Sequence, residues 1–340
     1  MKKITFLSVL SLLVLGGCSK KNPAPSNSGH VGGVTTYAGN GTAGLQNGGA
    51  ASAEFNLPVD MVTDIYGNIY ISEQGNNDIR VITAAGQVIT LAGTGTKGYK
   101  DGDAASAQFN DPEGLVIDDL GNLYVADAGN NVIRMIAPTG KVSTYAGNGT
   151  AGLHNGAAAS AEFASPKGLT IDKQRNIYVA DYSNNVIRKI SSTGSVSTLA
   201  GSSAAGNANG TPESASFSGP TGLAIDNANN IYVAEAANGD IRQVSQGGQV
   251  STFAGSLPNP VRVSADAASG NVYVSCTNNT IMKVDASGKS SVFAGNQTPG
   301  SVDGTLTTAE FSAPMGLIAF PQGQVLVADY GNSKIRVITP

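Results

Sequence analysis

Short runs of apolar and β-branched residues alternate with polar turns along most of the chain. In one copy of the pattern, such runs occupy residues 114–118, 122–127, 131–136 and 141–146, separated by Asp-x-x-Gly and Thr-Gly turns. Alternation with a period of two, interrupted by turn residues, is typical of an antiparallel meander of four strands. No window keeps a helical period for more than about one turn. The pattern therefore predicts an all-β protein.

The four-strand unit repeats along the chain. Its anchoring apolar residue recurs with spacings of 54, 54, 54, 40 and 54 residues, at Phe55, Phe109, Phe163, Phe217, Leu257 and Phe311. A period of this size, with four strands per repeat, predicts the blades of a β-propeller. The last repeat stops after three strands, whereas residues 34–39 match the fourth-strand segment 142–147. We therefore predict six blades, with the N-terminal strand completing the last blade so that no long sheet edge is left between the ends.

Four motifs within the repeat resemble those of a known family. P-x-G-L-x-x-D, G-N-x-Y-V-A-D, N-x-I-R-x-I and T-x-A-G follow one another within one period. In these motifs residues 34–340 resemble bacterial NHL-repeat propellers. The resemblance implies a six-bladed propeller. It leaves the function open, because similar propellers serve both as interaction modules and as enzymes.

Composition excludes several classes of protein. Glycine accounts for 44 of 340 residues and charged residues for 13%, which fits a turn-rich β protein and excludes a coiled coil, a collagen and a mostly disordered chain. Two cysteines cannot form a disulfide framework. The two histidines cannot form a three-histidine zinc site. We interpret His30 as a solvated linker residue and His154 as an exposed loop residue.

The N-terminal residues predict export and lipidation. Lys2 and Lys3 precede an apolar run over residues 4–15, and Leu-Gly-Gly-Cys at 15–18 resembles a bacterial lipobox. Residues 1–17 are then a lipoprotein signal peptide, Cys18 is the lipidated (palmitate-bearing) N-terminus, and residues 18–33 form a flexible tether. Ser19 after the cysteine implies an outer-membrane lipoprotein, on its periplasmic or its surface side. The alternative is an ordinary signal peptide that happens to contain a cysteine.

Charge limits the partners of the mature chain. Removal of Lys2 and Lys3 takes the formal net charge from −4 to −6, and no compact basic run follows the tether. Nucleic-acid binding through bulk electrostatics is therefore not expected. We expect membrane contact only through the N-terminal lipid, and a monomer.

An acidic residue after the second strand precedes an arginine by seven residues in five blades. The pairs are Glu73 with Arg80, Asp127 with Arg134, Asp181 with Arg188, Glu235 with Arg242, and Asp329 with Arg336. Blade five has Cys276 and Met282 instead, and joint loss is expected of a buried charge pair, because one partner alone is costly. We interpret these residues as structural acid–Arg pairs, against the alternative of a ring of ligand-binding acids. Cys276 is then a small apolar filler.

Glycine-rich segments of similar length precede five of the anchoring phenylalanines. They span Gly39–Glu54, Gly93–Gln108, Gly147–Glu162, Gly201–Ser216 and Gly295–Glu310. Each leads to another strand, not to a helix, so they are interpreted as long inter-blade loops rather than phosphate-binding loops. The corresponding 14 residues are missing between Phe253 and Pro260. This predicts a gap in the rim between blades four and five, which either admits an extended partner or is a neutral deletion.

The starts of the innermost strands are expected to line the mouth of the central channel. The second residue after proline is Gly114, Gly168, Gly222 and Gly316 in four blades but Asp60 and Arg262 in the others, with Glu113 and Lys167 alongside. We predict a polar ligand or partner site there, formed by Asp60, Glu113, Lys167 and Arg262. A mouth filled only with water is the alternative. Tyr182 and Tyr330 add aromatic surface to the same face.

The favoured function is a lipid-anchored, non-enzymatic scaffold that binds a protein or peptide partner in the bacterial cell envelope. Function in such folds normally resides on the loops. One alternative is a metal-dependent hydrolase or lyase resembling gluconolactonase-type propellers, with Asp60 and Glu113 as oxygen ligands but no clear third carboxylate. Another is a ligand-binding lipoprotein. No catalytic residue, metal or cofactor is assigned.

Overall fold

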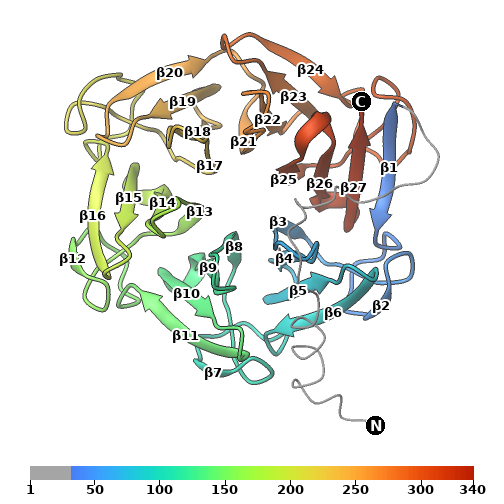
Figure 1. Ribbon diagram of the computed structural model, residues 1–340, viewed down its shortest axis with the longest axis horizontal. Coiled ribbons are helices and arrows are strands. Elements are labelled where there is room, and N and C mark those ends of the chain that lie inside the picture. Colours follow the sequence, from blue (N-terminus) through green and yellow to red (C-terminus); the bar gives the residue numbers. More distant parts are fainter. Residues whose placement is uncertain (1–31) are drawn as a thin grey trace.

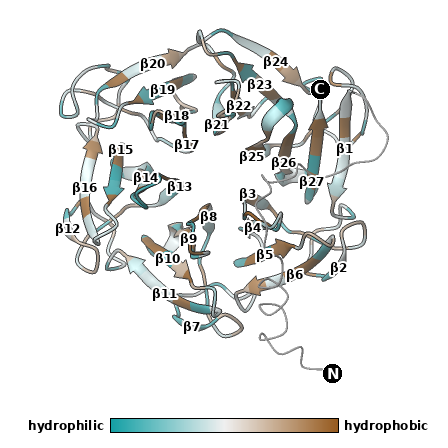
Figure 2. Cartoon of the chain, viewed as in Figure 1, coloured by the Kyte–Doolittle hydropathy of each residue, from teal (hydrophilic) through white to brown (hydrophobic). Residues whose placement is uncertain are grey.

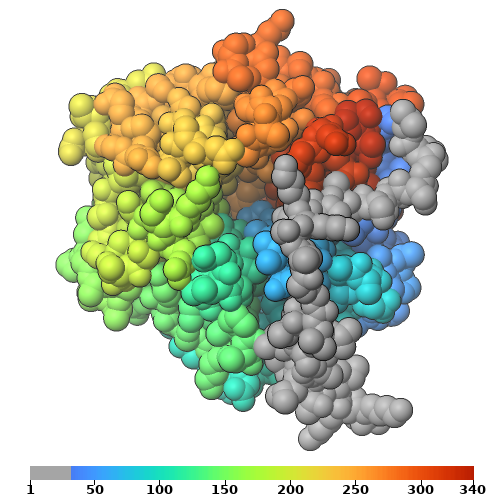
Figure 3. All heavy atoms as spheres, viewed as in Figure 1, coloured from blue at the N-terminus to red at the C-terminus, as the bar shows by residue number. Residues whose placement is uncertain are grey.

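The computed structural model describes residues 32–340, which form six antiparallel β-sheets arranged as a ring around a central axis (Figure 1). Each sheet is one of the predicted blades, and the blades follow one another around the ring in sequence order (Figures 1 and 3). The predicted all-β, six-bladed propeller is confirmed.

Blades one to three each contain four main strands and a two-residue strand at the outer edge. Blade one consists of β3 (Pro58–Thr63), β4 (Ile69–Glu73), β5 (Asp78–Ile82), β6 (Gln87–Ala92) and β2 (Gly48–Gly49). Blade two consists of β8 (Pro112–Ile117), β9 (Leu123–Asp127), β10 (Val132–Ile136), β11 (Lys141–Ala146) and β7 (Gly102–Asp103). Blade three consists of β13 (Pro166–Ile171), β14 (Ile177–Asp181), β15 (Val186–Ile190), β16 (Ser195–Ala200) and β12 (Gly156–Ala157).

Blades four to six contain four strands each. Blade four consists of β17 (Leu223–Ile225), β18 (Ile231–Glu235), β19 (Asp240–Val244) and β20 (Val250–Ala254). Blade five consists of β21 (Pro260–Ala265), β22 (Val272–Cys276), β23 (Thr280–Val284) and β24 (Ser290–Ala294). Blade six consists of β25 (Pro314–Ala319), β26 (Val325–Asp329), β27 (Lys334–Thr339) and β1 (Gly33–Ala38). Within residues 32–340, four short 3₁₀ helices lie at turns: η1 (Ala128–Asn130), η2 (Tyr182–Asn184), η3 (Pro321–Gly323) and η4 (Tyr330–Asn332).

The first strand closes the ring by joining the last blade. β1 pairs antiparallel with β27, with Gly33 opposite Thr339 and Thr36 opposite Arg336. Blade six therefore takes its outer strand from the opposite end of the chain, as the orphan fourth-strand segment predicted.

In five of the six blades, the turn between the first and second strands is fixed by an aspartate, whereas blade six has Phe320 at this position. In blade two, Asp118 Oδ1 accepts hydrogen bonds from the backbone N–H groups of Leu120 and Asn122, while its Oδ2 accepts from the Asn122 amide and the Tyr124 hydroxyl. An aspartate that bonds to the backbone two residues ahead stabilises a tight turn. The Asp-x-x-Gly-Asn segment thus forms the hairpin that the sequence pattern predicted.

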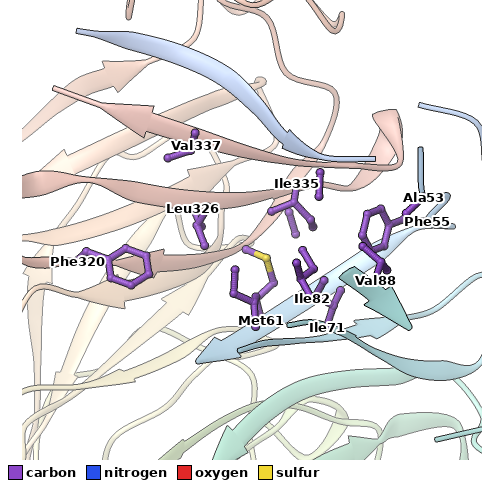
Figure 4. Packing of buried hydrophobic residues seen from close by; sticks show 13 residues of the cluster. Ala53, Phe55, Met61, Ile71, Ile82, Val88, Phe320, Leu326, Ile335 and Val337 are labelled. Carbon is purple, nitrogen blue, oxygen red and sulfur yellow. The ribbon is translucent and has the colours of Figure 1, made fainter. Parts of the chain in front are cut away.

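The hydrophobic core lies between neighbouring blades, and the strands of every blade contribute hydrophobic residues (Figure 2). Between blades one and six, Phe55, Met61 and Ile71 share one cluster with Ile335 and Val337 (Figure 4). Burial of each such side chain contributes about 1.5–3 kcal/mol. The anchoring phenylalanines are all fully buried, at Phe55, Phe109, Phe163, Phe217 and Phe311.

The five glycine-rich segments, named here the cover loops (residues 39–54, 93–108, 147–162, 201–216 and 295–310), fold onto the outer strand of the blade that follows. Two-residue strands make this contact in blades one to three, and single β-bridges make it in blades four and six. The pairs are Gly48↔Val88, Gly102↔Val142, Gly156↔Val196, Gly210↔Val250 and Gly304↔Val34. These short pairings were not predicted from the repeat.

Blade five has no cover loop. β20 ends at Ala254 and β21 begins at Pro260, so the connection is too short to reach the outer strand. At the position where the other blades bury a valine, β24 carries the half-buried Ser290, and Val292 in the same strand is 54% exposed. The rim therefore has a gap between blades four and five.

Candidate functional site

The cover loops and the turns between second and third strands lie on one face, named here the loop-rich face. In blade two, Asn130 Nδ2 donates to the carbonyl of Gly98 in the cover loop at 2.9 Å. Asn184 makes the equivalent bond to Gly152 at 2.7 Å in blade three. In these blades, the asparagine that ends the Ala-Asp-x-x-Asn segment therefore connects the cover loop to the turn beside it through a hydrogen bond.

The glycines expected at the channel mouth are packing positions between inner strands. A Cβ atom added to Gly114 would lie 2.4 Å from the carbonyl oxygen of Lys167, and one added to Gly316 would lie 2.7 Å from Cα of Asp60. Such distances are shorter than real Cβ contacts, so glycine lets neighbouring inner strands approach. The repeated glycine therefore serves ring closure, not ligand contact.

Three of the four predicted mouth residues meet in one buried cluster. Arg262 Nη2 donates to Glu113 Oε2, and Arg262 Nη1 donates to the carbonyl of Thr221 at 3.1 Å. Arg262 and Glu113 are each only 3% exposed. Lys167 Nζ lies 3.8 Å from Glu113 Oε1, on the more open side of the cluster. Glu113 is thus neutralised by a buried guanidinium and faces a second cation.

Asp60 is held by backbone groups rather than by a side-chain cation. Its Oδ2 accepts from Leu115 N at 3.1 Å and its Oδ1 from Met61 N at 2.9 Å. Burial raises the pKa of Asp60 to about 6, while the positive charge of Arg262 acts in the opposite direction. The carboxylate bridges the inner strands of blades one and two.

A cavity of about 570 Å³ lies beside this cluster, between blades three and four. Lys167, Tyr182, Ser218, Ala236 and Ala237 contribute to its wall. Lys167 Nζ stands 4.3 Å from the centroid of the Tyr182 ring, which is within range of a cation–π interaction. The volume lies within the usual range for small-ligand sites. Sequence reasoning named Lys167 and Tyr182 but missed the cavity, because small residues in one turn carry no motif.

Of the two tyrosines expected on this face, only Tyr182 borders the cavity. Tyr182 is 37% exposed. Tyr330 is half-buried, and its hydroxyl donates to Gln74 Oε1 at 2.5 Å. Gln74 Nε2 in turn donates to Asp111 Oδ1. Tyr330 is therefore part of a chain of contacts that connects blades six, one and two.

Each predicted acid–Arg pair is in contact in the structure, with both side chains fully buried. The carboxylate and guanidinium lie 2.8 or 2.9 Å apart in Glu73 with Arg80, Asp127 with Arg134, Asp181 with Arg188, Glu235 with Arg242, and Asp329 with Arg336. Burial raises the pKa of Asp127, whereas its hydrogen bonds with Asn130, the Asn110 backbone and Arg134 oppose the shift. These acids face the arginines and not the channel.

The interpretation of these arginines as partners of an acid alone was incomplete, because each also packs on an anchoring phenylalanine. The guanidinium carbon lies 5.0–5.5 Å from the ring centroid, within cation–π range. Within residues 32–340 the buried Nε atoms of all five arginines have no hydrogen-bond partner. The stacked pairs are Arg80 on Phe55, Arg134 on Phe109, Arg188 on Phe163, Arg242 on Phe217, and Arg336 on Phe311.

The same arginines hold the cover loops, which sequence reasoning missed. Arg134 Nη1 donates to the carbonyl of Gln108, and Nη2 donates to the carbonyl of Lys100 and to Asp101 Oδ1. A loop side chain 33 residues upstream accepts from each arginine: Asn47 from Arg80, Asp101 from Arg134, Asn155 from Arg188, Asn209 from Arg242, and Asp303 from Arg336. Each immediately precedes glycine. That constant dipeptide and spacing are a signal from which the role could have been inferred.

Blade five lacks every part of this arrangement. Cys276 is fully buried and Met282 is 9% exposed in place of the acid and the arginine. Burial raises the pKa of the Cys276 thiol to about 12, so almost none of the reactive thiolate is present at neutral pH. Cys276 therefore packs as an apolar side chain.

The predicted lipidation site lies outside the described residues, as do the signal peptide and most of the tether. Cys18 belongs to that part of the chain, and β1 begins at Gly33, where the tether was expected to end. Over residues 32–340, no helix has the length and apolar character needed to cross a bilayer.

The ring of six sheets defines a six-bladed β-propeller. Two of its segments, residues 109–134 and 163–190, match the NHL repeat. The chain thus contains NHL repeats within a six-bladed β-propeller, as its motifs predicted. Human NHL repeat-containing protein 2 is 28% identical over 314 residues, and the alignment covers 84% of this chain. The chain spans 38% of the length of that relative.

Solved structures with the same architecture include a binding protein and an enzyme. An auxiliary nutrient binding protein from Bacteroides thetaiotaomicron matches with a TM-score of 0.68 at 14% identity, covering 90% of this chain and 76% of that one. A gluconolactonase from Xanthomonas campestris matches with a TM-score of 0.60 at 13% identity, covering 84% of this chain and 86% of that one. These likenesses show the fold alone, so function must be argued from the site.

Proposed function

We propose that this propeller is a non-enzymatic binding protein that holds a protein or peptide partner on its loop-rich face. The cavity beside Lys167 and Tyr182 carries the proposal. One wall is the turn of Ala236 and Ala237, and the short connection 255–259, where a cover loop is missing, lies beside this turn. In that connection Leu257 N donates to the carbonyl of Gly239 at 2.8 Å, which keeps it close to the turn. The face therefore combines a concave site with an uncovered flank, as an extended partner requires.

The arrangement of the mouth supports binding over metal-dependent hydrolysis. A divalent metal needs several free oxygen ligands. Both Asp60 oxygens accept backbone N–H groups, and Glu113 is engaged by Arg262 and Lys167. Arg262 also places a positive charge against Glu113, one of the two expected ligands. The residues present do not fit the metal of the gluconolactonase-type alternative.

A ligand-binding protein for small solutes is the second candidate. The cavity volume of about 570 Å³ is within the range of small-ligand sites. A solved protein of the same fold is called an auxiliary nutrient binding protein. The two candidates share the cavity but differ in the size and chemistry of the occupant.

The proposal includes a lipid anchor at Cys18. Lipidation of Cys18 would fix the propeller to a membrane of the cell envelope, and Ser19 favours the outer membrane. Labelled palmitate should be incorporated by the wild type and not by Cys18→Ala. Equal labelling of the two chains would exclude lipidation at Cys18.

Capture of partners from an envelope extract tests the binding function. Residues 19–340 serve as bait, with Ala237→Arg filling the cavity entrance on an exposed turn. Ala228→Arg is the matched control, because Ala228 is exposed in the turn between β17 and β18 of the same blade, on the opposite face. We expect a stoichiometric protein with wild type and Ala228→Arg but not with Ala237→Arg. Capture by all three chains would place binding elsewhere.

A further inference from the structure

The departures of this chain from its own repeat meet at the cavity. The position occupied by Lys167 holds uncharged residues or an acid in the other five blades, namely Val59, Glu113, Thr221, Val261 and Met315. A tyrosine at the position of Tyr182 occurs in only one other blade, as Tyr330, and the counterpart in blade four is the small Ala236, which lines the cavity together with Tyr182. Gly219, which lies against the Tyr182 ring, has a left-handed φ of 58° and no Cβ to displace that ring.

The wall of the cavity carries a positive charge. Lys167 is its cation, and the residues that line it within the described part of the chain include no aspartate or glutamate. Glu113 lies behind the wall and is already paired with Arg262. The distance from Lys167 Nζ to Glu113 Oε1 is 3.8 Å, too long for a hydrogen bond. The ammonium group, whose side chain is 26% exposed, therefore lies at ion-pair distance from Glu113 without spending an N–H group on it, and these N–H groups can donate into the cavity.

Other side chains that line the cavity carry hydroxyl groups. Three of them are Tyr182, Ser183 and Ser218. Among residues 32–340, none of their hydroxyl groups has a hydrogen-bond partner in the protein. An ammonium group with neutral donors in the same cavity is complementary to an anion of carboxylate size, because hydrogen bonds to a charged group are the strongest that such donors make.

We propose that the cavity binds a carboxylate group, with Lys167 Nζ as its cation and the hydroxyls of Tyr182, Ser183 and Ser218 as further donors. The inference rests on the proposed binding function and names the chemistry of the occupant. The carboxylate belongs either to a peptide, at its C-terminus or an acidic side chain, or to a sugar acid. The cation–π contact with Tyr182 holds Lys167 in place before the ligand arrives.

Calorimetric titration with matched acid and neutral probes tests the inference. The pairs are N-acetyl-trialanine with a free C-terminus against its amide, a blocked Ala-Glu-Ala peptide against Ala-Gln-Ala, and glucuronate against glucose. We expect at least one acid to bind about tenfold or more tighter than its neutral counterpart, which corresponds to one charge-assisted hydrogen bond. The difference should disappear in Lys167→Met and persist in Lys167→Arg.

Lys173→Met is the control, because Lys173 is exposed in the turn between β13 and β14 on the opposite face. It should retain the preference for the acid. Equal binding of every acid and its neutral counterpart, absence of binding by all probes, or an acid preference that survives Lys167→Met would each overturn the carboxylate site.

The probes also separate this inference from the proposed function. Binding of peptide acids supports both. Binding of glucuronate but of neither peptide acid keeps the carboxylate site and replaces the peptide partner with a solute. If partner capture depends on Ala237 but not on Lys167, and no acid is preferred over its neutral counterpart, the binding function is supported and the carboxylate site is excluded.

Discussion

Arg262 of blade five and Glu113 of blade two form a buried ion pair across the centre of the ring, between blades that lie opposite each other in the ring of six. Most contacts in a propeller join neighbouring blades, whereas this pair joins the two halves of the ring. Its two charges cancel inside the mouth, which leaves Lys167 as the cation that faces the adjacent cavity. The mouth therefore supports the ring, and the cavity beside it is the part available to a ligand.

Breaking this pair on one side should destabilise the propeller more than removing both partners. Arg262→Met leaves Glu113 buried with only the more distant Lys167, and loss of one partner of a buried pair costs about 3–5 kcal/mol. Arg262→Met with Glu113→Leu should recover part of the loss. Urea unfolding of the four chains of this double-mutant cycle measures the coupling, and additive effects would show that the cross-channel pair is energetically unimportant.

The arginine of each pair should control its cover loop. Arg134→Met removes the donors to Lys100 and Asp101, and it leaves the buried Asp127 without its arginine. We therefore expect a stability loss of about 3–5 kcal/mol. Asp127→Cys with Arg134→Met reproduces the residues of blade five and should regain part of that stability.

The loop itself should remain loose in this double variant. Trypsin should then cut at Lys97 or Lys100 while the wild-type loop resists. A double variant that is both stable and resistant would mean that the arginine does not hold the loop.

Asp78 should make stability fall as the pH rises. Both its carboxylate oxygens are buried without a hydrogen-bond partner, and burial, with the nearby charge of Glu73, raises its pKa from 3.8 to about 9. The folded chain therefore holds the proton more tightly than the unfolded chain. This stabilising effect is complete below pH 3.8 and is lost as the pH approaches 9, by at most about 1.4 kcal/mol per pH unit. Asp78→Asn should flatten the curve of unfolding free energy against pH.

Comparison of the blades suggests how the carboxylate of Asp78 could be given a hydrogen-bond donor. In blade four, Asn207 Nδ2 donates to Asp240 Oδ2 at 2.7 Å, whereas the corresponding loop position in blade one is Leu45. Leu45→Asn should supply the missing donor, lower the pKa of Asp78 and raise stability at pH 8 by about 1 kcal/mol. Asn207→Leu is the reciprocal control and should be destabilising. An unchanged pH profile in Leu45→Asn would exclude this explanation.

Removal of β1 should weaken the whole ring rather than one edge. Val34 is fully buried, and residues 33–36 pair along β27, so deletion of residues 31–39 exposes the core of blade six. We expect a single unfolding transition at a lower temperature, and partial recovery when a peptide of residues 32–39 is added. Unchanged thermal unfolding of the deletion would refute closure by the N-terminal strand.

The periodic features were predictable and the cross-ring features were not. The 54-residue spacing, the orphan fourth strand and the joint loss at Cys276 and Met282 all follow from comparing copies within one chain. Arg262 and Glu113 are 149 residues apart, and their contact depends on the channel width, which no repeat pattern encodes. The cavity was missed for a related reason, because it depends on how side chains of blades three and four meet in space.

Photo-crosslinking in living cells tests the central claim most directly. A benzoylphenylalanine residue replaces Tyr182 at the cavity or, as the control, Tyr66, which is 51% exposed in the turn between β3 and β4 on the opposite face. The account predicts one discrete crosslinked partner from position 182, absent from position 66 and lost when Ala237→Arg is added. Crosslinks from position 66 alone, or the same products from both positions, would contradict binding at the loop-rich face.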